Sequence, residues 1–95
     1  MAPRILFEIS LTGDSDGRLR AAYIHLRKTK VSRTREIVED MVLADYDSQN
    51  RLVGIEILGP VKIQILARLI DKKDRSAFRR FAKENIPVSL LQQAA

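Results

Sequence analysis

Apolar and polar side chains alternate in several stretches between residues 4 and 58, and each stretch ends at turn-forming residues. Successive side chains of a strand point to opposite faces, so this alternation predicts strands with one buried face. We expect strands over residues 4–12, 19–27, 35–46 and 51–58, with a bend or bulge at Glu39 and Asp40 in the third. Turns at residues 12–17 and 47–50 should close two hairpins.

A glycine-proline pair at residues 59–60 ends this part of the chain. Proline suits the first turn of a helix because it has no N–H to lose there. Apolar spacings of three and four predict helices over residues 61–70 and 74–84, the second capped by Asp74, although residues 61–67 would also satisfy a strand. Residues 87–95 should add a short third helical turn with Leu90 and Leu91 inward.

The predicted fold class is therefore α+β, a small four-stranded antiparallel sheet in the order of a β-meander followed by two or three C-terminal helices. A chain of 95 residues is expected to be a single domain. Its sheet part would span residues 1–59 and its helical, basic part residues 60–95.

Composition limits where such a protein works. The chain has no cysteine, which rules out a disulfide framework and a thiolate metal site. Residues 1–5 do not resemble the start of a signal peptide, and no apolar run reaches the roughly 18 residues that a membrane span needs. We therefore expect a cytoplasmic protein that does not span a membrane.

The polar motifs have simpler explanations than catalysis. His25 is the only histidine, so no histidine triad or two-histidine metal site can form. Residues 14–17 begin like a calcium loop, but Arg18 and Leu19 stand where a ligand and the sharp-turn glycine belong. Asp45 and Asp47 point the same way in a strand and could form a carboxylate pair, but the hairpin turn explains them better. We expect no enzyme, no catalytic residues, no cofactor and no metal.

The segment 51–58, RLVGIEIL, interrupts an apolar strand with Gly54 and Glu56. Strand alternation places Val53, Ile55 and Ile57 together on the buried face. Leu52, Gly54, Glu56 and Leu58 then lie on the opposite face. Glycine there would leave room for the close approach of another backbone or a bulky ring.

The basic excess lies in the last third of the chain, where residues 60–95 hold eight basic and three acidic side chains. Arg75, Arg79 and Lys83 recur every four residues on the predicted helix 74–84, with Arg80 beside them. These four residues are candidate contacts for nucleic acid or another anion. The alternative is an ordinary solvated helix face, because Phe78 and Phe81 fall on the buried side, where they cannot stack on bases.

Four motifs occur in a characteristic order: Y-I-x-L-R at 23–27, V-x-R-T-R-E at 31–36, D-Y-D at 45–47 and R-L-V-G-I-E-I-L at 51–58. Over about residues 5–60 this order resembles the small prokaryotic family known as domain of unknown function 2283. The chain departs from the family at Asn50, where members usually carry glycine, and in a longer, less acidic first turn. The resemblance implies a small β-rich fold with a trailing helix and implies no reaction. Because similar families often occur beside small toxin genes, it also implies an antitoxin-like role.

Two functions follow from these observations. The first is a non-catalytic protein-interaction module, antitoxin-like, that uses sheet edges or the tail to hold a partner protein. The alternative is a nucleic-acid-binding module that uses the basic C-terminal helix.

Self-association is also expected. We expect a homodimer because Leu6, Tyr23, Leu52 and Leu58 place apolar side chains on the face opposite the predicted core. A small toxin-like protein is the rival occupant of that face.

Overall fold

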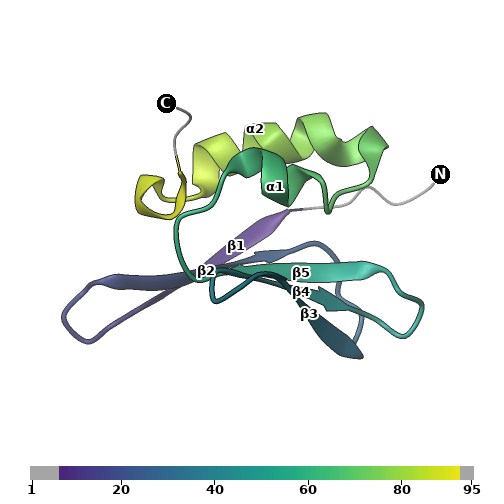
Figure 1. Cartoon of the computed structure of the whole chain (residues 1–95), viewed down its shortest axis with the longest axis horizontal. Coiled ribbons are helices and arrows are strands. Elements are labelled where there is room, and N and C mark those ends of the chain that lie inside the picture. The colour runs from purple at the N-terminus through teal and green to yellow at the C-terminus, as the bar shows by residue number, and fades with distance from the viewer. Residues whose placement is uncertain (1–6, 93–95) are drawn as a thin grey trace.

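The computed structural model of the chain describes residues 7–92. Five strands come first: β1 (Glu8–Gly13), β2 (Leu19–His25), β3 (Arg33–Val38), β4 (Val42–Tyr46) and β5 (Leu52–Ile57). They are followed by α1 (Ile63–Ala67), the 3-10 turn η1 (Lys72–Asp74), α2 (Arg75–Asn85) and the 3-10 turn η2 (Val88–Leu90). The helices lie on one side of the sheet, and within residues 7–92 no helix covers the other side (Figure 1).

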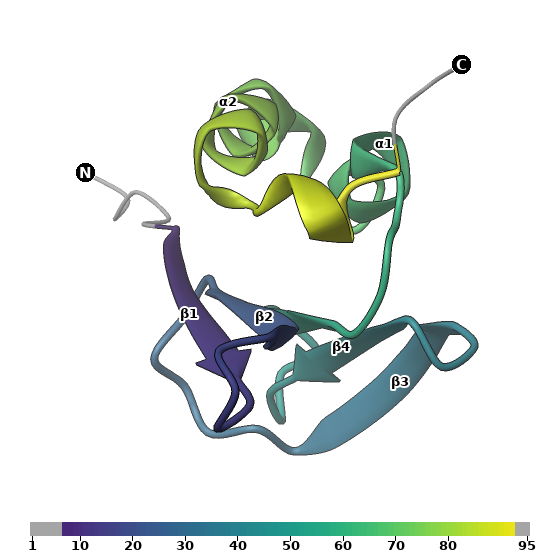
Figure 2. The same cartoon turned by 90° about the vertical axis from the view of Figure 1, so that its left-hand side faces the viewer.

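The α+β class and the antiparallel sheet are confirmed, but the predicted β-meander is wrong. The strand order is β1-β2-β5-β4-β3, so the chain crosses from β2 to the far edge of the sheet before it returns through β4 to β5 (Figure 2). Strands β2 to β5 thus have the order of a Greek key. The physical reason lies in β5, in which every residue except Glu56 is buried. A strand this apolar is most stable with a neighbour on each edge, and β2 and β4 provide them.

The expected long strand 35–46 is also wrong, because it is a hairpin of β3 and β4. The N–H of Met41 donates to the carbonyl of Val38 at 3.0 Å and closes a tight turn. Asp40 takes a φ of 59° in this turn, a left-handed conformation that aspartate tolerates better than most residues. The Glu39-Asp40 interruption therefore marks a reversal of the chain and raises the number of strands to five.

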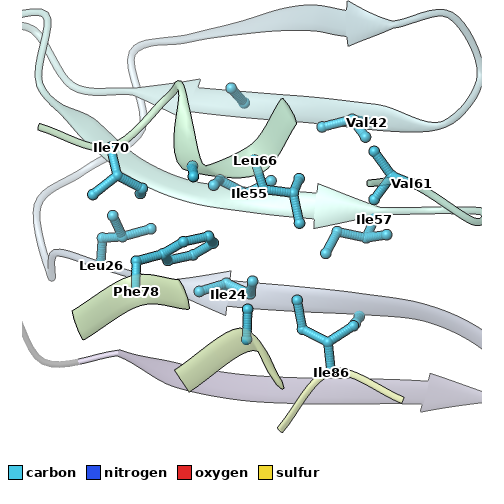
Figure 3. Packing of buried hydrophobic residues seen from close by; sticks show 14 of the residues in the cluster. Ile24, Leu26, Val42, Ile55, Ile57, Val61, Leu66, Ile70, Phe78 and Ile86 are labelled. Atoms are coloured by element: carbon cyan, nitrogen blue, oxygen red, sulfur yellow. The ribbon is translucent and has the colours of Figure 1, made fainter. Parts of the chain in front are cut away.

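The core fills the space between the sheet and the helices. Ile24, Ile55 and Ile57 of the sheet are fully buried in one cluster with Leu66 of α1 and Phe78 of α2 (Figure 3). Phe7, which precedes β1, packs its ring 5.5 Å from those of both Phe78 and Phe81. The predicted inward face of α2 is confirmed, and this core fixes which face of the sheet remains open.

The predicted set of Val53, Ile55 and Ile57 needs a correction at Val53. Gly54 pairs with Asp45, whereas Leu52 pairs with the next residue, Tyr46, so Val53 is the extra residue of a β-bulge. The bulge reverses the alternation, and Leu52 joins the core cluster instead of lying on the opposite face. Val53 is buried but lies outside this cluster. Leu6, also expected opposite the core, lies outside the described residues.

The first predicted helix is shorter than expected, because α1 covers 63–67 of the predicted 61–70. Val61 instead forms an isolated parallel bridge with Leu91, and its carbonyl accepts from the N–H of Gln92 at 2.9 Å. The second helix agrees with the prediction within one residue at each end. The predicted Asp74 cap is wrong, because the Asp74 side chain accepts no capping hydrogen bond, and its Oδ2 is buried without a partner. The third helical turn is confirmed as η2, with Leu90 buried.

Candidate functional site

The open side of the sheet, called the outer face here, consists of two rows of side chains that cross all five strands. The first row is Glu8, His25, Gly54, Asp45 and Thr34, and the second is Ser10, Tyr23, Glu56, Leu43 and Glu36. Residues paired across antiparallel strands share one face of the sheet. These rows alternate with the core-facing rows, so they point away from the helices.

Tyr23 lies across this face and joins three strands. Its ring passes from β2 over Gly54 of β5, and its hydroxyl donates to Oδ2 of Asp45 on β4 at 2.7 Å. A methyl group on Gly54 would overlap the hydroxyl and ring of Tyr23. The expectation that Gly54 makes room for a bulky ring is therefore confirmed, and the ring is that of Tyr23.

The hydrogen bonds continue on both sides of Tyr23. Asp45 accepts a second hydrogen bond, from the hydroxyl of Thr34 on β3 at 2.5 Å. On the other side the ring of His25 meets Tyr23 edge-on at 4.6 Å, and its Nε2 lies 2.9 Å from the hydroxyl of Ser10 on β1. One chain of contacts thus runs from β1 to β3 across the whole sheet.

The surroundings of Tyr23 keep it protonated. Desolvation raises the pKa of its hydroxyl above the usual value, and the hydrogen bond to Asp45 and the negative charges of Asp45 and Glu56 raise it further. The neutral hydroxyl donates a hydrogen bond to Asp45 and keeps its proton, so it cannot act as a base near neutral pH. In this network Tyr23 holds its neighbours in place.

Charge is distributed unequally between the two sides of the sheet. The outer-face rows contain the carboxylates of Glu8, Glu36, Asp45 and Glu56, and none of their positions is lysine or arginine. On β3 the arginines Arg33 and Arg35 pair with Tyr46 and Ala44 and so lie on the helix side. The outer face is therefore acidic, although the whole chain has a net charge of +5.

The side chain of Asp47 stabilises the turn between β4 and β5 and does not pair with Asp45. Its Oδ1 accepts from the backbone N–H groups of Gln49 and Arg51, each at 2.9 Å, and its Oδ2 accepts from Thr29 and Arg51 at 3.0 Å. Asn50 completes the turn with a φ of 63°, as its residue type predicts. The two carboxylates have separate partners and share no site, as the explanation by the hairpin turn requires.

The four candidate anion contacts lie on α2. Arg79, Arg80 and Lys83 are exposed, whereas Arg75 is half-buried and donates from Nε to the carbonyls of Ala67 and Ile70 at 3.0 and 2.9 Å. Arg75 and Arg79 line a shallow hollow with Gln64, Ala67 and Arg68 of the α1 segment, and Arg80 and Lys83 do not. The sequence did not predict Arg68 here, because its place beside α2 depends on how the two helices pack.

The other polar motifs form local turns. In residues 14–17 Asp14 pairs with Arg20, and Asp16 accepts from the backbone N–H of Arg18 at 3.1 Å. Within residues 7–92, no group of three or more histidine, cysteine or acidic side chains lies close enough to hold a metal ion. In the same part of the chain, no helix has the length and apolar character of a membrane span.

Comparison with known proteins gives one match. A family model described as a protein of unknown function (DUF2283) matches residues 21–59, which confirms the resemblance seen in the sequence. This stretch contains Tyr23, Asp45 and Gly54 of the outer face and also Asp47. No curated protein and no solved structure matches the chain.

The contact between Tyr23 and Gly54 predicts that the effect of Gly54→Ala on stability depends on whether Tyr23 is present. Gly54→Ala should destabilise the protein by about 1–3 kcal/mol, because the new methyl group forces Tyr23 away from Asp45. In a Tyr23→Ala background the same change should be neutral or stabilising by about 0.5–1 kcal/mol, because alanine suits a strand better than glycine. Urea unfolding of the four proteins measures both values. Equal costs in the two backgrounds would contradict the contact.

The low pKa of the Asp47 carboxyl predicts that the folded protein loses part of its stability in acid. The hydrogen bond from the backbone N–H of Arg51 is the main reason that the pKa of Asp47 falls from 3.8 to about 2. Hydrogen bonds from the side chains of Thr29 and Arg51 lower this pKa further, and desolvation opposes the shift. Because the folded-state pKa is the lower one, the ionised group stabilises the fold above pH 3.8, and this stabilisation is lost as the pH falls toward about 2.

Asp47→Asn should therefore be less stable than the unmodified protein at pH 6, and the difference should shrink as the pH falls below 4. Thermal unfolding at a series of pH values measures this difference. Asp40→Asn is the matched control, because Asp40 is an exposed turn residue at a left-handed φ that asparagine tolerates. A stability difference that stays constant with pH would argue against the low pKa.

Proposed function

We propose that this chain is a non-catalytic protein-interaction module whose outer face binds a basic surface of a different protein, in an antitoxin-like manner. The observation that supports this proposal is the acidic, uncovered outer face with its side chains held in place by the Tyr23 network. Complementary charge speeds encounter and selects partners. The module needs no cofactor, and we place it in the cytoplasm, which suits a chain without cysteine.

The outer face has the mixture of groups that protein interfaces use. Tyr23 and His25 are half-exposed aromatic rings with fixed positions, and Leu43 adds a half-buried apolar side chain in the same row. Met41 and Leu58, at the ends of β4 and β5, are 36% and 40% exposed. Aromatic and apolar side chains among charged ones are common on surfaces that bind other proteins. Side chains that are already ordered also lose less entropy on binding.

A homodimer stays a prediction, but the outer face is a poor place for it. The burial of Leu52 removes one of the apolar side chains on which that expectation rested. A two-fold contact between outer faces would also bring the carboxylates of one copy against those of the other. We therefore assign the outer face to a different protein and a homodimer, if it forms, to the edge strands β1 or β3.

Charge reversal on the outer face tests the proposal. Tagged protein would capture partners from native cell extract, with Glu36→Lys and Glu8→Lys as exposed reversals in two different strands. Glu84→Lys on α2 is the matched control, since it makes the same change in charge on the helix side. Captured proteins should be basic and should be lost with both outer-face variants, while the control retains them.

Circular dichroism must show that all three variants remain folded. If the control loses the partner as fully as the outer-face variants, the interaction depends only on net charge. If the outer-face variants retain it, the partner binds elsewhere. Either result would overturn the assignment of the outer face.

A further inference from the structure

The hollow between α1 and α2 brings arginines from two helices together. Gln64 and Arg68 are four residues apart on α1 and its C-cap, and Arg75 and Arg79 are four residues apart on α2. Residues at this spacing share one face of a helix. The helices α1 and α2 contact each other on the helix side of the sheet (Figure 2). The residues of the two faces line one shallow hollow.

Arg75 gives this hollow a fixed donor. Its Nε donates to the carbonyls of Ala67 and Ile70, which holds the guanidinium at the C-terminal end of α1. The side chain is half-buried, and its other N–H groups have no recorded hydrogen bond within residues 7–92. A donor whose position is already fixed loses little entropy when it binds a ligand.

Within residues 7–92, no ion pair neutralises the positive charge in the hollow. Among residues 7–92 the ion pairs are Arg18 with Asp16, Arg20 with Asp14, and Arg51 with Asp47, and none of them involves Arg68, Arg75 or Arg79. The hollow is lined by no acidic side chain. Guanidinium groups held near one another repel, and an anion placed between them relieves the repulsion.

We propose that the hollow is a binding site for a phosphate group, with Arg68, Arg75 and Arg79 as donors and the Gln64 amide as an additional one. Arginine has a planar fork of donors that fits the oxygens of phosphate two at a time. A free or terminal phosphate carries nearly two negative charges near neutral pH, and a nucleic-acid backbone carries one on each of several neighbouring groups. Either offers three arginines more charge and more acceptor oxygens than a single carboxylate. The phosphate belongs to a free anion, a nucleotide or a nucleic-acid backbone.

This site differs from the set of four α2 residues predicted from the sequence. That set includes Arg80 and Lys83, which do not line the hollow, and omits Arg68, which does. The site is also separate from the outer face, which lies on the opposite side of the sheet. The failure of either proposal therefore leaves the other intact.

The test uses the full chain, inorganic phosphate as the probe, and sodium chloride at matched ionic strength as the reference. Calorimetric titration should show saturable binding of phosphate. Arg68→Gln and Arg79→Gln should each weaken it by roughly tenfold, the value of a charge-assisted hydrogen bond. Arg80→Gln and Lys83→Gln, which remove the same charge from neighbouring positions, should change it less than about twofold. Arg75 is left in place because it also anchors α1.

Two results would overturn the proposal. One is phosphate binding no stronger than that of chloride, and the other is an equal loss in all four variants, which would reveal only a general charge effect.

A second experiment uses a short single-stranded oligonucleotide with the same variants. Tighter binding than phosphate with the same dependence on Arg68 and Arg79 would support the site and identify a nucleic-acid backbone as the source. Binding of phosphate alone would support a small-anion site.

Discussion

The placement of Tyr23 across Gly54 is the contact on which the outer face of the sheet depends. The ring starts on β2, crosses β5 and reaches Asp45 on β4, so it ties the N-terminal hairpin to the three strands that follow it in the Greek key. Only glycine permits this, because any side chain at position 54 would occupy the place of the ring. The G-I-E interruption of an apolar strand is thus a structural requirement of the outer face.

The two sides of the sheet differ in what covers them and in their charge. The helices bury one side through a core of aliphatic and aromatic residues, which leaves the polar network of the other side uncovered (Figure 1). Carboxylates collect on that open side, whereas the arginines of β3 and the basic helix α2 occupy the opposite side. A net charge of +5 therefore conceals two surfaces of opposite sign. This separation is the physical basis on which we propose two partners, a basic protein on the outer face and a phosphate group between the helices.

Local patterns in the sequence predicted the local features well. The turn at residues 47–50, the left-handed Asn50, the close approach at Gly54 and the buried face of α2 all depend on the residue types themselves. The failures have non-local causes. Asp40 reverses the chain in a turn that periodicity alone does not distinguish from a bend, and the bulge at Val53 moves Leu52 into the core only because of its pairing with β4.

The strand order and the candidate sites were harder to predict for the same reason. The sequence indicated a meander because neighbouring strands usually pair, whereas the burial of β5 requires β2 beside it. It identified Arg75 and Arg79 but not Arg68, which approaches them only through the packing of α1 on α2. The acidic outer face became visible only when the register placed residues from five strands in common rows.

Proton NMR of the Gly54 α-protons tests the central contact most directly. A proton beneath the face of an aromatic ring is shielded, so the resonances of Gly54 should lie far upfield of ordinary glycine values and should return to them in Tyr23→Ala. Tyr46→Phe is the control, because the ring of Tyr46 faces the helix side, and it should leave the shift unchanged. Ordinary Gly54 shifts in the unmodified protein would show that Tyr23 does not cross the strand, and would contradict the account of the outer face built on it.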